Sequence, residues 1–368
     1  MMPPIAKITG AGVVASCGRG RADFWRGLCA HRTGRAAVDD PDLHAEVRDM
    51  HLVEDAPCLE HSAARYGVEA AREALAEAKA AGSRVTCGDL GLVVGTGMGE
   101  ATSLDRARAS TPTDKRMFET ADLIADALGL SGPVLSTSNA CAASAYAVGL
   151  ALDILAAGEA SAVLVTGAEA YSRVALAAFN RMLALDPAGA RPFELERAGT
   201  LFGEGAGALV LEPESSSATA LGSLITADFS CDADHITAPE QAGVQIRRIL
   251  QTVVGQAAPR AAVPHATGTQ LNDELEAAIL HEVAGEDLPW LSIKDTIGHA
   301  GGASGILGII AALAMLEAGE RPEHGPHGPW LDTASTHLGE RTTAVGPVVV
   351  SAYAFGGNNA SLVIGGAA

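Results

Sequence analysis

Short, unbroken apolar runs alternate with longer helical segments along this chain. Runs that are apolar at nearly every position predict strands buried on both faces, at residues 5–14, 90–94, 162–166 and 205–211. Between the strands, the Ala- and Glu-rich segment 62–81 and the apolar segment 141–157 predict helices. This alternation predicts an α/β protein in which helices cover buried sheets.

Two apolar helices repeat one pattern in distant parts of the chain. Segments 142–159 and 303–320 open with small residues, have the same length and end in Leu-Xaa-Ala-Gly-Glu. Chance similarity between two Ala-rich helices is one explanation. The other is an internal duplication, which predicts two similar α/β halves. Superposing the segments places Cys141 on Gly302, so a duplicated chain keeps this thiol in only one half.

Two stretches have the composition of exposed connections. The Ser- and Ala-rich stretch 213–220 predicts a joint between an N-terminal half, residues 1–220, and a C-terminal half, residues 221–368. The segment 317–338, rich in Pro, Gly and His, predicts a surface loop, since no carboxylate or Cys completes a metal site around His324 and His327.

The charge of the chain limits its partners. A formal net charge of −19 over 368 residues argues against binding nucleic acid. An acidic protein partner would need a local basic patch, for which a solvated surface is the alternative interpretation. The candidates for such a patch are Arg19, Arg21, Arg26, Arg32 and Arg35, or Lys115 with Arg116.

Cysteine use and hydropathy indicate a reducing, cytoplasmic setting. The six cysteines form no CxxC pair and no Cys/His metal spacing, so free thiols and no metal site are expected. The Met1 start shows no basic-then-apolar signal peptide. The longest apolar run, residues 306–316, is too short to span a membrane, so no membrane insertion is expected.

Cys141 is the first candidate for chemistry. It follows Ser138-Asn139-Ala140 and directly precedes the apolar helical segment. Free N–H groups and the positive end of the helix dipole favour thiolate over thiol, which predicts a nucleophile. The alternative is a buried, inert thiol among alanines.

A histidine loop follows the short apolar stretch 261–263. His265 lies where the strand ends, and Thr267 and Thr269 place hydroxyls at alternate positions, suited to holding a polar chain. Asn272 or Asp273 is the predicted N-cap of the next helix.

A second histidine loop precedes the repeated helix. A strand ending near Ser292 is expected to lead into a loop that holds Lys294 and His299. The helix dipole disfavours the imidazolium form of His299, so this ring should stay neutral and donate a hydrogen bond. Two histidines in Gly-rich loops, downstream of a helix-start Cys, strengthen the catalytic interpretation.

Two glycine-rich turns complete the set. Phe355-Gly356-Gly357 follows a β-branched strand and can expose backbone N–H groups to a ligand, although an ordinary turn before the last strand, 361–364, explains it too. The turn 95–99 lacks the GxGxxG and GK[ST] registers, so it predicts a tight strand exit and not a phosphate loop.

Taken in order, these motifs resemble a β-ketoacyl synthase, the condensing enzyme of fatty-acid and polyketide assembly, in its Cys-His-His branch. The resemblance rests on five ordered motifs over nearly the whole chain: Asn139-Ala140-Cys141, 203–207, His265 through Asp273, Lys294 through His299, and Phe355-Gly356-Gly357. It implies the thiolase fold, two duplicated α/β halves in five α/β/α/β/α layers, and a dimer.

The resemblance also implies roles for individual residues. Cys141 would take an acyl group from an acyl-carrier protein, and His265 and His299 would stabilise the enolate formed as malonyl-carrier protein loses CO2. The N–H groups of Cys141 and Phe355 would form the oxyanion hole, with Phe355 also gating the site. The supporting residues would be Thr267 and Thr269 on the phosphopantetheine arm, Lys294 as electrostatic lysine, and Glu276 as its acidic partner. No free cofactor is implied, because the substrates ride on the carrier protein.

Several positions depart from the family pattern. Ala266 replaces the usual Gly, Asn358 stands where Thr is usual, and Thr200 occupies an acyl-pocket position where many members carry Phe. The chain is shorter around 110–120 and 241–264. Together with Gln270-Leu271-Asn272, these departures favour a secondary-metabolite enzyme of the type II polyketide or aryl-polyene kind.

Three other functions remain open at this point. A chain-length-factor-like subunit would lack the Cys, although an active subunit can pair with one in a heterodimer. A thiolase or chain-initiating synthase would carry Asn in place of His299. An acyltransferase of the same fold, which transfers the acyl group without decarboxylation, shares the acyl-Cys141 step.

Overall fold

The computed structural model describes residues 5–53, 62–101, 116, 118–323, 328–343 and 346–367. The strands are β1 (Ala6–Ala15), β2 (Gly18–Arg19), β3 (Arg35–Ala37), β4 (Asp49–His51), β5 (Leu90–Gly95), β6 (Val134–Thr137), β7 (Ala162–Glu169), β8 (Gly205–Glu212), β9 (Gly222–Cys231), β10 (Ala261–Val263), β11 (Glu320–Arg321), β12 (Thr342–Thr343), β13 (Val348–Tyr353) and β14 (Asn358–Gly366). The helices are α1 (Arg21–Cys29), α2 (Ser62–Ala80), α4 (Thr120–Leu128), α5 (Ala143–Ala157), α6 (Arg173–Arg181), α7 (Val244–Ala257), α8 (Gln270–Ala284), α9 (Lys294–Ile297), α10 (Ser304–Ala318) and α11 (Asp332–Ser335), with single 3-10 turns η1 (Ala140–Ala142) and η2 (Gly301–Ala303).

The strand order is the same in the two halves of the chain. In the first half, neighbouring strands follow the order β1-β8-β7-β5-β6, and in the second half the order β9-β14-β13-β10, continued by a parallel bridge from Ala262 to Trp290. In both halves the first three strands are antiparallel neighbours and the remaining pairings are parallel. This agreement confirms the internal duplication.

The repeated helices match in backbone detail as well as in sequence. Ala140 and Gly301, which open η1 and η2, have φ angles of 46° and 42°, and both 3-10 turns lead into helices of 15 residues. Both helices end at a left-handed glycine, Gly158 and Gly319, with φ 68°. Cys141 and Gly302 therefore occupy equivalent positions in the two halves.

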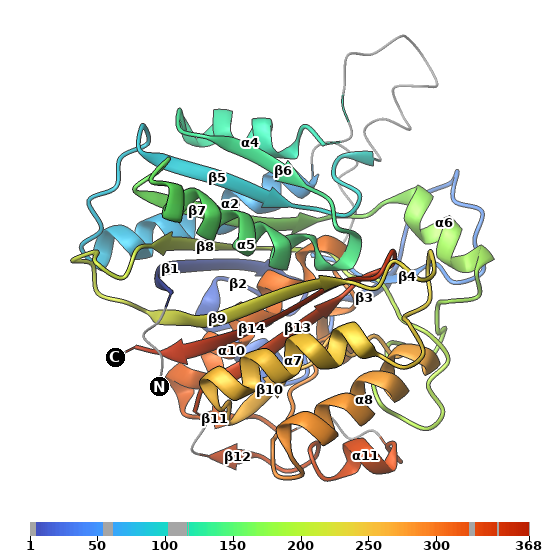
Figure 1. Cartoon of the computed structure of the whole chain (residues 1–368). Helices are drawn as coiled ribbons and strands as arrows, with labels where there is room; N and C mark the ends of the chain where they lie inside the picture. The colour runs from blue at the N-terminus through green and yellow to red at the C-terminus, as the bar shows by residue number, and fades with distance from the viewer. Residues whose placement is uncertain are drawn as a thin grey trace.

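The elements form five layers, visible in Figure 1. Helices α2 and α4 cover the outer face of the first-half strands, while α7 and α8 cover the outer face of the second-half strands. Helices α5 and α10 lie between the two groups of strands. A short antiparallel pairing of β1 with β9, from Ala6 to Ile8, joins the groups. The fold is thus the predicted α/β/α/β/α arrangement.

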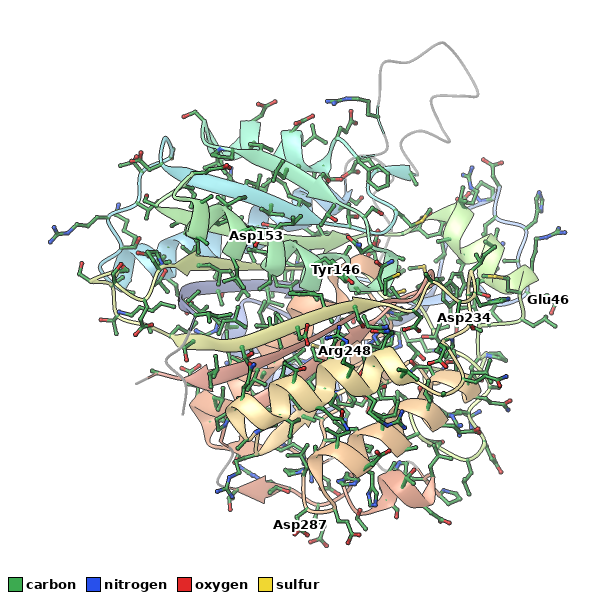
Figure 2. The ribbon with its side chains drawn as sticks, viewed as in Figure 1. Glu46, Tyr146, Asp153, Asp234, Arg248 and Asp287 are labelled. Carbon is green, nitrogen blue, oxygen red and sulfur yellow. The ribbon has the colours of Figure 1, made fainter. Side chains whose placement is uncertain are left out.

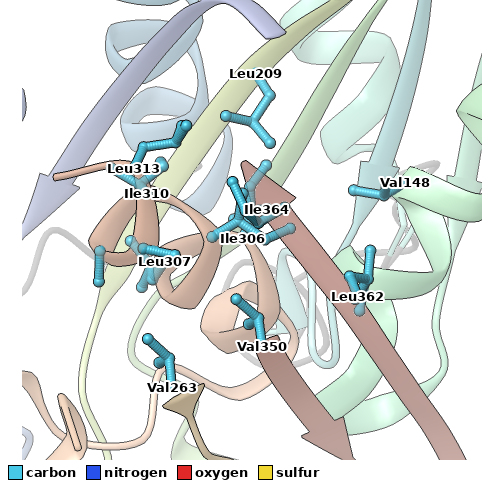
Figure 3. Packing of buried hydrophobic residues seen from close by; sticks show 14 of the residues in the cluster. Val148, Leu209, Val263, Ile306, Leu307, Ile310, Leu313, Val350, Leu362 and Ile364 are labelled. Atoms are coloured by element: carbon cyan, nitrogen blue, oxygen red, sulfur yellow. The ribbon is translucent and has the colours of Figure 1, made fainter. Parts of the chain in front are cut away.

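The central layer holds the largest hydrophobic cluster. Figure 3 shows Ile306, Leu307 and Ile310 of α10 packed among side chains of strands from both halves, including Leu209 of β8 and Val350 of β13. Burial of such side chains contributes about 1.5–3 kcal/mol each. This packing fixes where α5 and α10 begin, and both begin at the candidate site.

The central helices also bear on the membrane expectation. Segments Ala140–Ala157 and Gly301–Ala318 are long and apolar enough to cross a membrane, each with a mean hydropathy of 1.7, so the expectation that no segment qualifies is wrong on this criterion. Both are core helices, since each packs against strands on its two sides.

Most predicted elements match the structure to within a few residues, and three details are wrong. The predicted surface loop 317–338 contains β11 and α11, and Arg321 and Ala334 within it are buried. Helix α8 has Thr269 as N-cap, not Asn272 or Asp273, because the Asp273 carboxylate instead accepts hydrogen bonds from the preceding loop. Ser292 ends no strand, and Lys294 opens the short helix α9 and not a loop. His324, His327, Cys58, Lys115 and most of the 110–120 segment lie outside the described residues, while the remaining cysteines are free thiols.

The candidate arginines for a basic patch are paired with carboxylates, which agrees with the alternative interpretation of a solvated surface. Each described arginine of the patch forms an ion pair with a carboxylate: Arg19 with Glu69, Arg21 with Glu77, Arg26 and Arg32 with Asp23, Arg35 with Asp49, and Arg116 with Asp122. Exposed carboxylates also occur away from these arginines; Figure 2 labels Asp153, Asp287 and the pair Glu46 and Asp234 in different parts of the molecule.

Candidate active site

Cys141 lies in a strained turn between β6 and α5. The preceding residue, Ala140, has φ 46°, a left-handed conformation that is uncommon for a residue with a side chain. This turn places Cys141 in η1, two residues ahead of α5, at the edge of a cavity. The Asn139 amide donates a hydrogen bond of 3.2 Å to the Asn358 side chain, which ties this turn to the glycine turn of residues 355–357.

His299 reaches Cys141 from the second half of the chain. Its Nε2 lies 3.1 Å from the Cys141 Sγ, and its Nδ1 lies 2.9 Å from the Ser304 hydroxyl. A hydroxyl can donate or accept, so Ser304 supports either neutral tautomer of the ring. The Nε2 atom can therefore accept the thiol proton in one step and donate a hydrogen bond in another.

His265 is held by a buried carboxylate. The Glu276 carboxylate on α8 accepts hydrogen bonds from the backbone N–H of His265 at 2.6 Å and of Ala266 at 2.7 Å. These two bonds hold a turn in which Ala266 has φ 50°, where the family usually has Gly. The His265 and His299 rings are nearly perpendicular, with centroids 5.6 Å apart, and both line the cavity.

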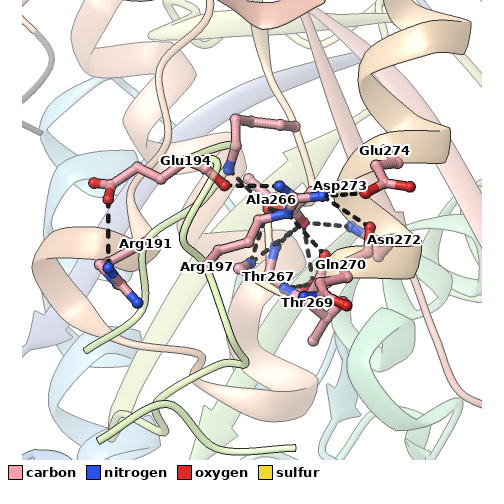
Figure 4. Close-up of polar contacts among 12 residues, drawn as sticks. Arg191, Glu194, Arg197, Ala266, Thr267, Thr269, Gln270, Asn272, Asp273 and Glu274 are labelled. Atoms are coloured by element: carbon pink, nitrogen blue, oxygen red, sulfur yellow. Dashed lines mark hydrogen bonds and ion pairs between the residues drawn. The ribbon is translucent and has the colours of Figure 1, made fainter. Parts of the chain in front are cut away.

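The two threonines form a hydroxyl pair beside His265. Thr267 Oγ1 and Thr269 Oγ1 are 2.9 Å apart. The buried Asp273 carboxylate accepts hydrogen bonds from the N–H groups of Thr267 and Gly268. Figure 4 shows Asp273 and Thr267 within this network. Arg197 lies 3.9 Å from the same carboxylate and donates to the Gln270 carbonyl. This network fixes the loop that presents both hydroxyls.

Lys294 lies behind the histidines. Its ammonium group donates a hydrogen bond to the His265 carbonyl. Glu276 and Lys294 are linked through the His265 backbone, and no ion pair joins these two described residues directly. Burial lowers the pKa of Lys294 and raises the pKa of Glu276. Together with burial, the positive charge of Lys294, which lies close to both imidazoles, lowers the pKa of each.

The thiol is not activated in the way the sequence suggested. Burial raises the pKa of Cys141 to about 11, against a lowering by Lys294 and by the N–H groups of Cys141 and Phe355. The Glu169 carboxylate raises it further. The expected thiolate is therefore wrong for the free site, where desolvation outweighs the helix terminus, and the sulfur needs a proton acceptor such as His299.

The surroundings of both histidines favour the neutral ring, as expected for His299. Burial, together with the positive charge of Lys294, lowers the pKa of His265 and of His299 well below the usual value. The main cause is desolvation and not the helix dipole. Two neutral imidazoles can act as hydrogen-bond donors or as proton acceptors at pH 7.

A cavity of about 440 Å³ joins the surface to these groups. Seven of the nine predicted site residues line it: Cys141, Thr200, His265, Thr267, Thr269, His299 and Phe355. The other two, Lys294 and Glu276, do not line it and instead form hydrogen bonds to the His265 backbone. The exposed apolar side chains of Leu183 and Leu271 also line this cavity. A flexible polar arm can reach Cys141 by this route.

A second cavity of about 230 Å³ lies on the other side of the thiol. Its lining is mainly apolar and includes Met50, Met98, Phe179 and Phe202. Phe179 and Phe355 stack with ring centroids 5.5 Å apart and an angle of 8°, and both rings line both cavities. This aromatic pair forms a wedge between the outer and the inner cavity, with Cys141 at their junction.

Comparisons with known proteins agree with this geometry. The chain matches the N-terminal domain of β-ketoacyl synthases over residues 60–217 and the C-terminal domain over residues 221–325. The chain belongs to the β-ketoacyl synthase family.

Three relatives illustrate the similarity. Nodulation protein E of Rhizobium meliloti is 29% identical over 321 residues, covering 78% of this chain and 79% of the relative. The 3-oxoacyl-[acyl-carrier-protein] synthase 2 of Synechocystis sp. (strain ATCC 27184 / PCC 6803 / Kazusa) is 28% identical over 338 residues, covering 79% and 80%. The solved ishigamide ketosynthase/chain length factor superposes with a TM-score of 0.89 at 30% identity, over 99% of this chain and 100% of that chain.

The structure of this β-ketoacyl synthase also places residues that the sequence analysis did not identify. Phe179 on α6 and Phe202 before β8 carry no recognisable motif, and only their positions against Phe355 and the inner cavity reveal them. Thr200 lines the outer cavity and is not among the residues of the inner one, so its assignment to the acyl pocket stays a prediction. Glu169, at the end of β7, is buried beside the inner cavity.

Proposed function

We propose that this chain catalyses decarboxylative condensation of a Cys141-bound acyl group with malonyl-acyl-carrier protein. The observation that carries the proposal is the 3.1 Å contact between the Cys141 Sγ and the His299 Nε2, with His265 facing the same cavity. One imidazole is sufficient to deprotonate a thiol. A second neutral imidazole that lines the same cavity favours stabilisation of an enolate.

The first step is acyl transfer. His299 Nε2 accepts the Cys141 proton, the sulfur attacks the carrier thioester, and the proton passes to the departing pantetheine thiolate. The Thr267 and Thr269 hydroxyls would hold the phosphopantetheine arm in the outer cavity. The N–H groups of Cys141 and Phe355, which both approach the sulfur, would bind the oxyanion. The acyl chain would then extend into the inner cavity.

The second step forms the carbon–carbon bond. Malonyl-carrier protein loses CO2, and the electron pair of the broken bond becomes an enolate whose oxygen accepts hydrogen bonds from His265 and His299. The enolate carbon attacks the acyl-Cys141 carbonyl and expels the thiolate, which takes up a proton. The product is a β-ketoacyl-carrier protein that is two carbons longer. Losing one such donor typically costs about 10²–10³ in rate.

The carrier protein is expected to dock at the mouth of the outer cavity. Leu183 is 82% exposed and Leu271 66% exposed at this mouth, and Arg181, two residues before Leu183, is also exposed. The paired arginines elsewhere offer no open basic patch among the described residues. Docking would therefore depend mainly on apolar contacts, which agrees with the acidic charge of the whole chain.

We expect a second subunit to bind where α5 and β6 leave apolar surface uncovered. This subunit is either an identical chain or a chain that resembles a chain-length factor. The segments of α5 and α10 have the same mean hydropathy of 1.7. Only 44% of the α5 segment is buried, whereas 78% of the α10 segment is buried. Beside α5, β6 stands at the end of the described sheet with Leu135 exposed. Such uncovered apolar surface is typical of a subunit interface. We place the assembly in the cytoplasm and favour polyketide or polyene synthesis, because Gln270-Leu271-Asn272 departs from the pattern of the fatty-acid enzymes.

Intact-mass analysis with acyl-carrier protein tests the proposal. An acyl adduct should form on the wild-type chain and be lost in Cys141→Ala, while Cys29→Ala, which removes an exposed thiol outside both cavity linings, should load normally. Adding malonyl-carrier protein should give a product extended by two carbons. An adduct without extension would instead support the non-decarboxylating acyltransferase, and no adduct would refute both functions.

A further inference from the structure

Glu169 is a buried carboxylate whose hydrogen-bonding capacity is fully used. Its Oε2 accepts from the N–H groups of Gly97 at 2.7 Å and Gly302 at 2.8 Å. Its Oε1 accepts from the Met98 N–H at 2.9 Å and the Thr96 hydroxyl at 3.3 Å. A carboxylate has about four acceptor sites, and the four bonds favour its ionised form, against the burial that raises the pKa of Glu169.

The carboxylate joins the two halves at a point of very close packing. Gly97 and Met98 follow β5 of the first half, while Gly302 lies in η2 of the second. A Cβ on Gly302 would lie 2.4 Å from the Gly97 nitrogen, and a Cβ on Gly301 would lie 2.7 Å from the Glu169 Oε2. The backbone of Thr96 and Gly97 therefore leaves no room for a side chain at Gly302, and the Glu169 carboxylate leaves none at Gly301.

The duplication relates this contact to the equivalent position in the active site. Gly302 is the counterpart of Cys141. The Gly302 N–H therefore corresponds to the Cys141 N–H that would bind the oxyanion, and it donates a hydrogen bond to Glu169. Gly97 follows β5 by two residues, just as His265 follows β10 by two residues. In the half without the nucleophile, the Gly302 N–H thus binds a protein carboxylate at the position where the Cys141 N–H would bind a reaction oxyanion.

The same contact supports the catalytic histidine. Gly302 is three residues after His299, so the bond to Glu169 anchors the far end of the short loop that presents His299 to Cys141. The titratable groups that face Cys141 are Lys294 and His299 before α10, His265 after β10, and Glu169 at the end of β7. Among these, Glu169 is the one with negative charge.

We propose that Glu169 is a positioning residue of the condensing site, whose carboxylate fills the degenerate counterpart of the oxyanion hole and fixes His299 against Cys141. This inference rests on the proposed function for its catalytic effect. Its electrostatic effect on the thiol does not depend on that function.

Two variants separate the effect of the Glu169 charge from the effect of its position. Glu169→Gln removes the charge and places an NH2 group opposite two donors, whereas Glu169→Asp keeps the charge on a side chain too short to reach both loops. The matched control is Glu212→Gln, a buried Glu at the end of β8 that accepts from the hydroxyls of Thr9 and Ser216, outside both cavity linings. All variants are first checked for folding by circular dichroism.

The measurements are condensation kinetics with malonyl-carrier protein and the pH dependence of Cys141 alkylation by iodoacetamide. Both Glu169 variants should lose about 10²-fold in kcat with little change in KM, as expected when a reacting group is misplaced. Glu169→Gln should also shift the alkylation midpoint to lower pH, while Glu169→Asp and Glu212→Gln should not.

Three results bear on the inference in different ways. Unchanged kcat in both Glu169 variants, or an alkylation midpoint that stays in place in Glu169→Gln, would overturn it. If Glu169→Gln does not fold, the kcat of Glu169→Asp decides. If the wild type alkylates at Cys141 and shows the predicted shift on Glu169→Gln but makes no extended product, the proposed function fails and the arrangement around Glu169 stands.

Discussion

The Nε2 atom of His299 lies 3.1 Å from the sulfur of Cys141, although the two residues belong to different repeats of a duplicated fold. Helix α5 begins just after Cys141, and α10 begins just after the loop that starts at His299. The starts of both helices meet in the central layer, and this meeting assembles the site. The bond between the His299 Nδ1 and Ser304, the first residue of α10, orients the ring.

The first prediction concerns the charge of this ring. Because burial and Lys294 lower the pKa of His299, its neutral form should persist at pH 6.5, where a free histidine is about half protonated. The ¹⁵N chemical shifts of the ring, assigned by comparison with His299→Gln, should show one protonated and one unprotonated nitrogen. The urea-unfolded chain is the control, and a doubly protonated ring in the folded enzyme at pH 6.5 would contradict the assignment.

The second prediction concerns the bond between the nucleophile turn and the glycine turn. Asn358→Ala removes the acceptor of the 3.2 Å bond from Asn139, which should cost about 0.5–1.5 kcal/mol, or roughly 2–10-fold in the rate of acyl loading. Asn358→Thr, which restores the usual family residue and keeps an acceptor oxygen, should lose less. Equal loss in both variants would show that the bond does not support loading.

The sequence contained enough to predict the layers and the residues that meet at the candidate site. Uninterrupted apolar runs mark strands buried on both faces, and β5, β7 and β8 lie where these runs occur. Cys141, His265 and His299 each sit at the end of an element, followed or preceded by small residues. The equivalence of Cys141 and Gly302 was also visible in the sequence. It follows because the two repeated helical segments have the same length and the same closing residues.

Properties set by burial and by long-range packing were not predictable in this way. The thiol was expected to ionise at a helix start, but desolvation by surrounding residues reverses that preference. Glu169 ends an apolar strand and carries no motif, so nothing in its local sequence reveals a carboxylate that binds donors from both halves. The wedge of Phe179 and Phe355 joins residues 176 positions apart and exists only in the folded chain.

The third prediction concerns acyl-chain preference. Phe202 lines the inner cavity and packs edge-on against Phe179 with ring centroids 4.7 Å apart. Phe202→Leu should enlarge this cavity at a stability cost of about 0.5–3 kcal/mol. In competition between acyl-carrier proteins of different chain length, the variant should load longer chains than the wild type does.

The control for this experiment is Phe24→Leu, the same substitution at a fully buried ring that lines neither cavity. Its chain-length preference should match that of the wild type. A preference in Phe202→Leu that also matches the wild type would show that the acyl chain does not occupy the inner cavity.

The fourth prediction uses two glycines for which the same substitution should have opposite effects on stability. In Gly302→Ala the new Cβ would lie 2.4 Å from the Gly97 nitrogen and 2.7 Å from the Thr96 carbonyl carbon, so the backbone must shift at a cost of about 1–3 kcal/mol. Gly255 lies inside α7, and a Cβ there meets no atom within 4 Å. Gly255→Ala should stabilise the protein by about 0.8–1 kcal/mol through helix propensity.

Urea unfolding at one protein concentration compares the two variants, because a concentration change would alter the apparent stability of an oligomer. The midpoint should fall in Gly302→Ala and rise in Gly255→Ala, with unchanged m-values. Gly302→Ala should also slow acyl loading, since the shift that relieves its clash displaces the loop of His299. A stable and fully active Gly302→Ala would mean that the close contact between the two halves, and with it the anchoring of His299, is not required.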